Sequence, residues 1–132
     1  EPDYFKNFLE RIEPLSWVNY QGKIKPGEAL LQAYRACDIF VMPSKFELFG
    51  LVYIEALSQG KPVLYSKGAG IDGFLTNYRA GKAVDPDNAD AIANGIKEIV
   101  KNYKDYTDFD EIVLPFNWDT IASVYRKLYI KK

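Results

Sequence analysis

IFVMPSKFELFGLVYIEALSQGKPV, residues 39–63, is the stretch that decides the fold. Its first four residues, Ile39–Met42, form an apolar run that is too short for a helix, so they predict a buried strand that the following proline ends. From Gly50 the apolar residues recur at helical spacing, and Gly60 suits the position just beyond a helix. Residues Lys61–Tyr65 predict a second strand, which completes the β–loop–α–β unit of a parallel sheet. The helix residues expected to face the core are Leu51, Ile54, Ala56 and Leu57.

The rest of the chain continues the alternation of helices and strands. Helices are expected from Pro2 to Ile12, from Gly27 to Ala36, after a cap signal at residues 85–88, and over residues 118–130. Further strands are expected at Trp17–Tyr20 and Lys82–Val84. The class is therefore α/β with a parallel sheet. The apolar residues expected to face inward from the last two helices are Ile92, Ile96, Ile99, Val100 and Tyr103, and then Ile121, Val124, Tyr125 and Leu128.

The loop Ser44–Phe49 is the predicted ligand site. It leaves the carboxyl end of a strand and enters the amino end of a helix, which is where open α/β sheets bind ligands. The helix terminus suits a phosphate, and Gly50 allows close approach to the backbone. Glu47 and Glu55 would repel phosphate but suit hydroxyl groups such as those of sugars. The pattern alone leaves open whether both glutamates are ordinary solvated charges.

Composition excludes several kinds of function. The 132 residues suit one domain, and 17 basic against 18 acidic residues give a net charge of −1, which argues against a nucleic-acid partner. No apolar run is long enough for a transmembrane segment. The single cysteine, Cys37, is expected to be a small core residue, and it fits a reducing compartment and hence a cytoplasmic location. The chain has no histidine.

Two D-x-D sequences, Asp85-x-Asp87 and Asp108-x-Asp110, resemble the acidic pairs with which some enzymes bind a metal ion. The first lies at a helix start, where the helix dipole favours acidic residues, and the second lies in a charged surface segment. Structural roles are therefore expected for both pairs. No metal and no cofactor are expected.

The central stretch resembles a known family. Residues 43–51, PSKFELFGL, with the glutamates at 47 and 55, resemble the nucleotide-sugar half of retaining GT-B glycosyltransferases of the group 1 (family 4) type, which is related to glycogen synthases. The family signature, E-x7-E, has seven residues between two glutamates. Residues 34–41 resemble its helix-to-strand lead-in, and residues 116–119 resemble its closing motif. The resemblance implies a Rossmann-like parallel sheet with helical crossovers, the C-terminal half of a GT-B fold.

The resemblance also implies an activity and a set of residues. The activity is transfer of a sugar from a nucleoside-diphosphate donor to a hydroxyl acceptor, with retention at the anomeric carbon. Glu47 would contact the donor sugar and stabilise its developing positive charge, and Glu55 would hold the ribose hydroxyls. The other expected donor-binding positions are the backbone N–H groups of Phe49, Gly50 and Leu51 for the diphosphate, Ile24 for the base, and Gly70 beside the sugar. Gly73 stands where the family usually has an acidic residue.

The resemblance further implies that residues 1–132 are a partial nucleotide-sugar-binding domain. The family's first strand–helix–strand unit and its N-terminal acceptor domain are expected to be missing, which would leave an open sheet edge. The carbohydrate or lipid-linked acceptor would bind through that other domain, and the full-length protein could associate peripherally with a membrane. The chain alone is expected to bind nucleotide weakly and to catalyse nothing.

Two other functions remain open from the sequence. Residues 68–73 form a G-x-G-x-x-G after a strand, which would suit a fragment of a dinucleotide-dependent oxidoreductase if a proper helix followed. Only seven residues separate Gly73 from Gly81, which is short for such a helix. The other possibility is a non-catalytic nucleotide-sugar-binding or partner module of the same fold.

Overall fold

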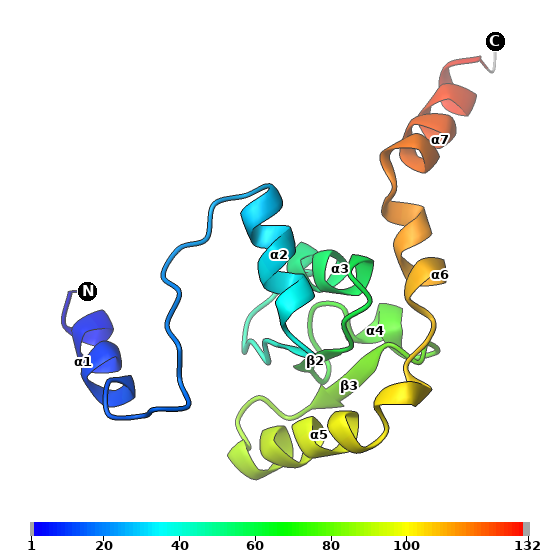
Figure 1. Cartoon of the computed structure of the whole chain (residues 1–132). Coiled ribbons are helices and arrows are strands. Elements are labelled where there is room, and N and C mark those ends of the chain that lie inside the picture. The colour runs from blue at the N-terminus through cyan, green and yellow to red at the C-terminus, as the bar shows by residue number, and fades with distance from the viewer. Residues whose placement is uncertain (1, 131–132) are drawn as a thin grey trace. The chain divides into compact units, whose positions relative to one another are not determined.

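The structure of the chain is a computed structural model and describes residues 2–130. The chain divides between Leu30 and Leu31 into two compact units, and each unit is described by itself (Figure 1).

The first unit contains helix α1 (Pro2–Ile12), which confirms the predicted helix. The rings of Phe5 and Phe8 contact Tyr20, with centroids 6.0 and 6.2 Å away. The predicted strand Trp17–Tyr20 is wrong, because this stretch has no strand structure. A strand needs a neighbour to accept its backbone hydrogen bonds, whereas here the Val18 N–H closes a turn on the carbonyl of Leu15.

The second unit is built on a parallel sheet of three strands among the described residues, in the order β1 (Phe40–Val41), β2 (Val63–Ser66), β3 (Gly81–Val84). In its register Phe40 lies opposite Val63, and Val63 lies opposite Gly81. Helix α3 (Leu51–Ser58) connects β1 to β2. The predicted parallel sheet with helical crossovers is confirmed.

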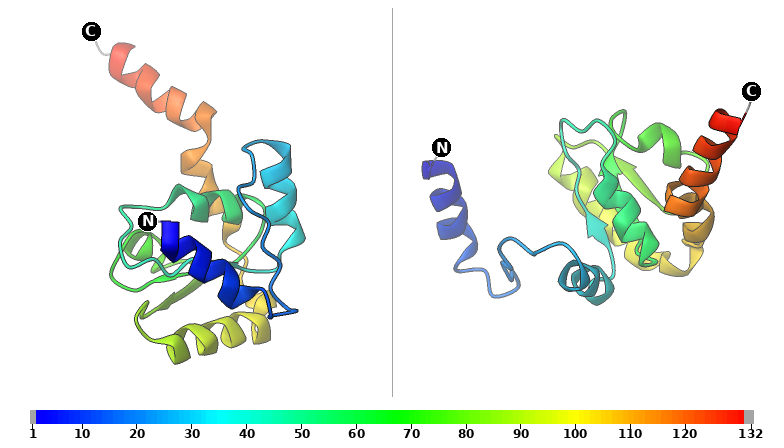
Figure 2. Two further views of the ribbon diagram at one scale, coloured as in Figure 1. Left: turned by 90° about the vertical axis from the view of Figure 1, so that its left-hand side faces the viewer. Right: turned by 90° about the horizontal axis from the view of Figure 1, so that it is seen from above.

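Helices cover both faces of this sheet. Leu64 of β2 packs with Val84 of β3 and with Ile99 of helix α5 (Ala89–Lys101). The next residue of β2, Tyr65, contacts the ring of Tyr53 in α3 at a centroid distance of 6.3 Å. Neighbouring residues of a strand point to opposite faces, so α5 and α3 lie on opposite sides of the sheet, as Figures 1 and 2 show.

The remaining elements are short or terminal. They are α2 (Glu28–Ala36), α4 (Asp72–Leu75), the 3-10 helices η1 (Tyr103–Asp105) and η2 (Leu114–Phe116), α6 (Phe109–Val113) and α7 (Trp118–Ile130). The predicted cap of α5 is confirmed, because the Asn88 side chain accepts the Ala91 N–H at 3.0 Å. Asn117 similarly accepts the Asp119 N–H at 2.8 Å at the start of α7. No helix within residues 2–130 is long and apolar enough to cross a membrane.

Some residues expected in the core are exposed. Leu51 is 65% exposed because it lies in the first turn of α3, beside the loop and not over the sheet. Val100 is 61% exposed because it lies beside, not on, the stripe of α5 that contains Ile99. The α7 residues Val124, Tyr125 and Leu128 are all more than half exposed, because α7 packs mainly on η2.

Candidate functional site

The loop Ser44–Phe49 lies where the sequence predicted it, between the carboxyl end of β1 and the amino end of α3. Its start is fixed by β2, since the buried Ser66 hydroxyl donates to the Ser44 carbonyl at 2.6 Å. The Tyr53 hydroxyl of α3 donates to the Met42 carbonyl just before the loop. The loop is thus tied to two neighbouring elements.

Glu47 lies between two glycines from different loops. Gly50 and Gly70 have φ angles of +84° and +57°, a conformation that favours glycine. A Cβ atom on either glycine would come within 3.2 Å of the Glu47 Cγ atom. The structure therefore brings together Glu47, Gly50 and Gly70, three of the residues predicted for the site.

Two of these residues, Glu47 and Gly70, line an open pocket of about 610 Å³. Phe46 and Leu48 stand on either side of Glu47 at this pocket and are 95% and 100% exposed. The pocket lies beyond the carboxyl ends of β1 and β2, where α/β sheets bind ligands. Its lining residues are Lys45, Phe46, Glu47, Leu48, Gly68, Ala69 and Gly70.

The Glu47 carboxylate accepts a backbone hydrogen bond and influences the pKa of Tyr53. Its Oε1 atom accepts the Leu48 N–H at 3.0 Å. Burial raises the pKa of the Tyr53 phenol, and the negative charge of Glu47 raises it further. Tyr53 therefore stays protonated at neutral pH and can keep donating to the loop.

Phe49 and Gly50 are the two residues that precede the first turn of α3. The Phe49 ring contacts Phe74 and Phe116 at centroid distances of 5.9 and 5.6 Å, so its side chain anchors the loop and leaves binding to the backbone. Gly50 is the N-cap residue and brings no side-chain acceptor to the first N–H groups of the helix. A bound anion could take that place.

Glu55 lies further along α3, on its exposed side. It follows Leu51 by four residues, which corresponds to a rise of about 6 Å along the helix. The hydroxyl of Tyr34 in α2 donates to the Glu55 Oε2 atom at 3.0 Å. Sequence reasoning missed this partner, because 21 residues separate the two positions.

Three residues of the two acidic pairs, Asp85, Asp87 and Asp108, have partners within the protein. Asp85 accepts the Asp87 N–H at 2.9 Å, and Asp87 forms an ion pair with Lys45. Asp108 accepts the Arg79 N–H at 2.8 Å and pairs with its guanidinium at 3.1 Å. No cluster of three or more potential metal ligands occurs in the described part of the chain.

The glycine-rich loop does not lead into a long helix. Helix α4 has only four residues, and the Asp72 carboxylate at its start accepts the Gly68 N–H at 2.7 Å. A dinucleotide fingerprint needs a full crossover helix at this point. The oxidoreductase alternative therefore loses its main support.

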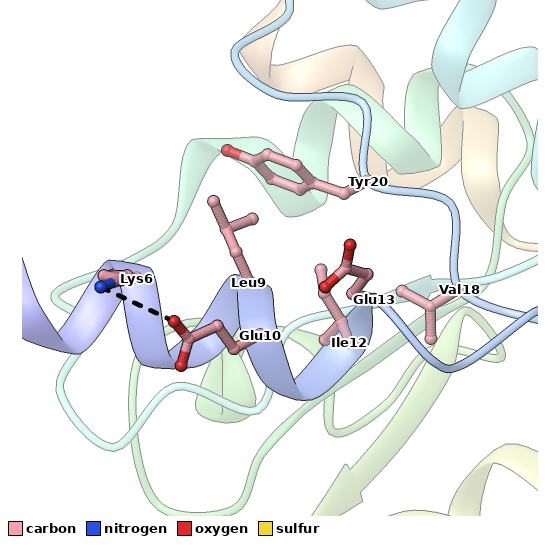
Figure 3. Close-up of a pocket in the computed structure, with 7 residues that line it drawn as sticks. All are labelled: Lys6, Leu9, Glu10, Ile12, Glu13, Val18 and Tyr20. Carbon is pink, nitrogen blue, oxygen red and sulfur yellow. Dashed lines mark ion pairs between the residues drawn. The ribbon is translucent and has the colours of Figure 1, made fainter.

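The first unit has a cavity of its own, of about 390 Å³ (Figure 3). Figure 3 shows Leu9 and Tyr20 directed toward one another across it, with Lys6 and Glu10 of α1 paired at 3.8 Å. None of the residues predicted for the site lines this cavity. Ile24 also belongs to the first unit and is half-buried, so its role toward the base stays a prediction.

The fold is a Rossmann-like half-domain, with the pocket at the strand ends, Glu47 on the loop and Glu55 on helix α3. The chain belongs to the glycosyl transferases group 1 family, which its sequence matches over residues 1–113. This finding confirms the resemblance found from the sequence.

Individual relatives support the same family and fold. The chain is 27% identical to an uncharacterized glycosyltransferase of Methanocaldococcus jannaschii, covering 96% of this chain and 34% of the relative. It is 34% identical to the O-antigen chain mannosyltransferase B of Escherichia coli, over 77% of this chain and 26% of the relative. The structure resembles sucrose-phosphate synthase from Thermosynechococcus elongatus with a TM-score of 0.75 and 28% identity, over 98% of this chain and 35% of that one. The chain thus spans about a third or less of these proteins.

Proposed function

We propose that this chain is the donor-binding part of a retaining glycosyltransferase that moves a sugar from a nucleoside diphosphate to a hydroxyl acceptor. The observation that carries the proposal is the position of Glu47, inside the pocket and packed between Gly50 and Gly70. Family membership supports glycosyl transfer in general.

The diphosphate would bind at the amino end of α3. The N–H groups of Phe49, Gly50 and Leu51 lie where a helix presents unpaired donors and a partial positive charge. These groups would stabilise the negative charge that grows on the diphosphate as it leaves. Because these backbone donors offset the negative charge of the diphosphate, we propose that transfer needs no metal ion.

The nucleoside would lie along α3 from that point. Glu55 is about 6 Å further along the helix than Leu51, a distance that suits a ribose attached to the diphosphate. A carboxylate accepts hydrogen bonds from two neighbouring hydroxyls, as the ribose offers. We assign Ile24 to an apolar contact with the base.

The sugar would lie in the pocket beside Glu47 and Gly70. In the reaction the bond between the anomeric carbon and the diphosphate oxygen breaks, and the acceptor oxygen bonds to the same face of that carbon. The hydroxyl proton leaves with the departing diphosphate. The Glu47 carboxylate would stabilise the positive charge that develops on the sugar ring between these two events.

The acceptor, a carbohydrate or a lipid-linked molecule, would bind to another part of the full-length protein. This part of the proposal is supported by the length of the relatives, of which the chain spans about a third or less. We therefore expect no transfer by these 132 residues alone.

Calorimetric titration of the chain with UDP, GDP and ADP tests the donor site. We expect binding to one of them, and binding roughly tenfold weaker in Glu55→Ala, which loses a charge-assisted hydrogen bond. Glu98→Ala is the matched control, because Glu98 is also an exposed helix glutamate with one side-chain partner, Lys82. Absence of binding to all three nucleotides contradicts the proposal. Binding that Glu55→Ala leaves unchanged favours a non-catalytic partner module instead.

A further inference from the structure

Tyr34 is a buried residue whose hydroxyl reaches an exposed carboxylate. Its side chain is only 7% exposed, yet its Oη atom lies 3.0 Å from the Glu55 Oε2 atom. Most of the tyrosine is therefore fixed in the protein interior, and only its polar end meets the side of α3 that faces solvent.

The surroundings leave the Tyr34 ring little freedom. It contacts the Phe40 ring of β1 at a centroid distance of 5.6 Å and an interplanar angle of 63°. Phe40 in turn contacts Tyr53 of α3 at 5.8 Å. The aromatic rings thus connect α2, β1 and α3, and they hold the Tyr34 hydroxyl at one place relative to α3.

Two further contacts tie the end of α2 to the end of α3. The Arg35 Nε atom donates to the Gln59 Oε1 atom at 2.8 Å. The Lys61 ammonium donates to the Arg35 carbonyl at 3.0 Å. Since Tyr34 precedes Arg35, both contacts keep its backbone close to the helix that bears Glu55.

A fixed donor matters for an exposed glutamate. A free glutamate side chain samples several rotamers, and fixing it on ligand binding costs up to about 2 kcal/mol of conformational entropy. A hydrogen bond to one carboxylate oxygen removes part of that freedom beforehand and leaves the second oxygen able to accept. Burial, together with the bond to Glu55, raises the pKa of Tyr34 well above its usual value, so the phenol keeps its proton at neutral pH.

We propose that Tyr34 is the positioning residue of Glu55: its hydroxyl holds Oε2 so that Oε1 is directed at the ribose hydroxyls of the bound nucleotide. The inference rests on the proposed function, because it needs Glu55 to bind the ribose. It extends the site to α2, a helix that contributes no other residue to it.

The test compares Tyr34→Phe with the unaltered chain in calorimetric titrations. The ligands are the nucleoside diphosphate that binds most tightly and its 2′,3′-dideoxy analogue, which lacks the ribose hydroxyls. We expect Tyr34→Phe to weaken binding of the nucleoside diphosphate about threefold to tenfold, the range for one hydrogen bond. Binding of the dideoxy analogue should be the same for both proteins. Tyr106→Phe, which removes the hydroxyl of a half-buried tyrosine packed against the α5 side of the sheet, is the control.

The possible results separate this inference from the proposed function. If the unaltered chain binds no nucleotide, or if Glu55→Ala has no effect, the proposed function fails and the inference fails with it. If Glu55→Ala weakens binding but Tyr34→Phe does not, only the inference is overturned. It is also overturned if Tyr34→Phe weakens both ligands equally, because a purely structural contact would act on the whole site.

Discussion

Replacing Gly50 by alanine tests whether the start of α3 is shaped by the absence of a side chain. The residue has φ +84°, which costs an alanine about 1–2 kcal/mol. The added Cβ atom would also lie 2.5 and 2.6 Å from two ring carbons of Tyr53, a side chain that is only 1% exposed. Overpacking of this kind costs about 1–3 kcal/mol. The total loss expected for Gly50→Ala is therefore about 2–5 kcal/mol.

Gly60→Ala is the matched control. Gly60 has φ +68° but nothing within 4 Å of an added Cβ atom, so only the backbone cost of about 1–2 kcal/mol applies. The two variants should thus differ by about 1–3 kcal/mol in the free energy of unfolding. Their difference isolates the contact with Tyr53 from the conformational preference of glycine.

Urea denaturation followed by far-UV circular dichroism measures both losses. Tryptophan fluorescence is the poorer probe, because Trp17 and Trp118 are both about four-fifths exposed. Equal destabilisation by Gly50→Ala and Gly60→Ala would refute the reasoning, since it would mean that Tyr53 moves away at no cost. If Gly50→Ala stays folded, it should also bind nucleoside diphosphate more weakly than Gly60→Ala, because the new methyl group stands at the amino end of α3, where the diphosphate would approach the backbone.

Two further predictions concern ion pairs. The pKa of Asp108 lies below its usual value, chiefly because the carboxylate accepts the Arg79 N–H. A lowered pKa in the folded state means that the stabilisation is present above the unfolded pKa of 3.8 and is lost as the pH falls through the folded value. When the pH is lowered from neutral to below about 4, the urea midpoint of Asp108→Asn should therefore fall less than that of the unaltered chain. An equal fall in both proteins would contradict this prediction. Lys45→Ala removes an exposed pair with Asp87 and should lower the urea midpoint only slightly, because solvent screens such pairs. A larger loss, or one that persists in about 1 M salt, would show that the pair does more than screened surface charges do.

The core of the fold was predictable because residues 39–63 carry two different periods. A short apolar run, a helical pattern and a second apolar run give β1, α3 and β2 in the predicted order. These are local signals, and the parallel connection follows from them. The strand bounds were less accurate: β1 covers only Phe40–Val41, since it pairs with β2 alone among the described residues.

The errors occurred where a pattern needs a partner. Residues Trp17–Tyr20 have the composition of a strand, but strand structure depends on a neighbouring strand. The stripe on α7 that includes Val124 and Leu128 is apolar at helical spacing, yet both residues are exposed. Periodicity shows which residues share a face, and it does not show what that face contacts.

The candidate site was predictable in outline because local signals in the sequence give the order of the elements around it. The loop Ser44–Phe49 and its position at the strand ends follow from the order of the elements. The nearness of Gly70 to Glu47 came from the family resemblance and not from the residues alone. The contact of Tyr34 with Glu55 had no signal in the sequence, because a hydrogen bond across 21 residues leaves no period or spacing to detect.

The two glutamates are positioned by different physical means that share one row of aromatic rings. Glu47 can lie between two loops because Gly50 and Gly70, which have no side chain, leave room for it. Glu55 is placed by an added contact, the hydroxyl of Tyr34. The rings of Tyr34, Phe40 and Tyr53 follow one another across α2, β1 and α3, and Tyr53 packs against Gly50 while Tyr34 holds Glu55. The donor site that we propose would need the carboxylates of Glu47 and Glu55 at a constant separation, and a continuous row of packed rings would provide that rigidity.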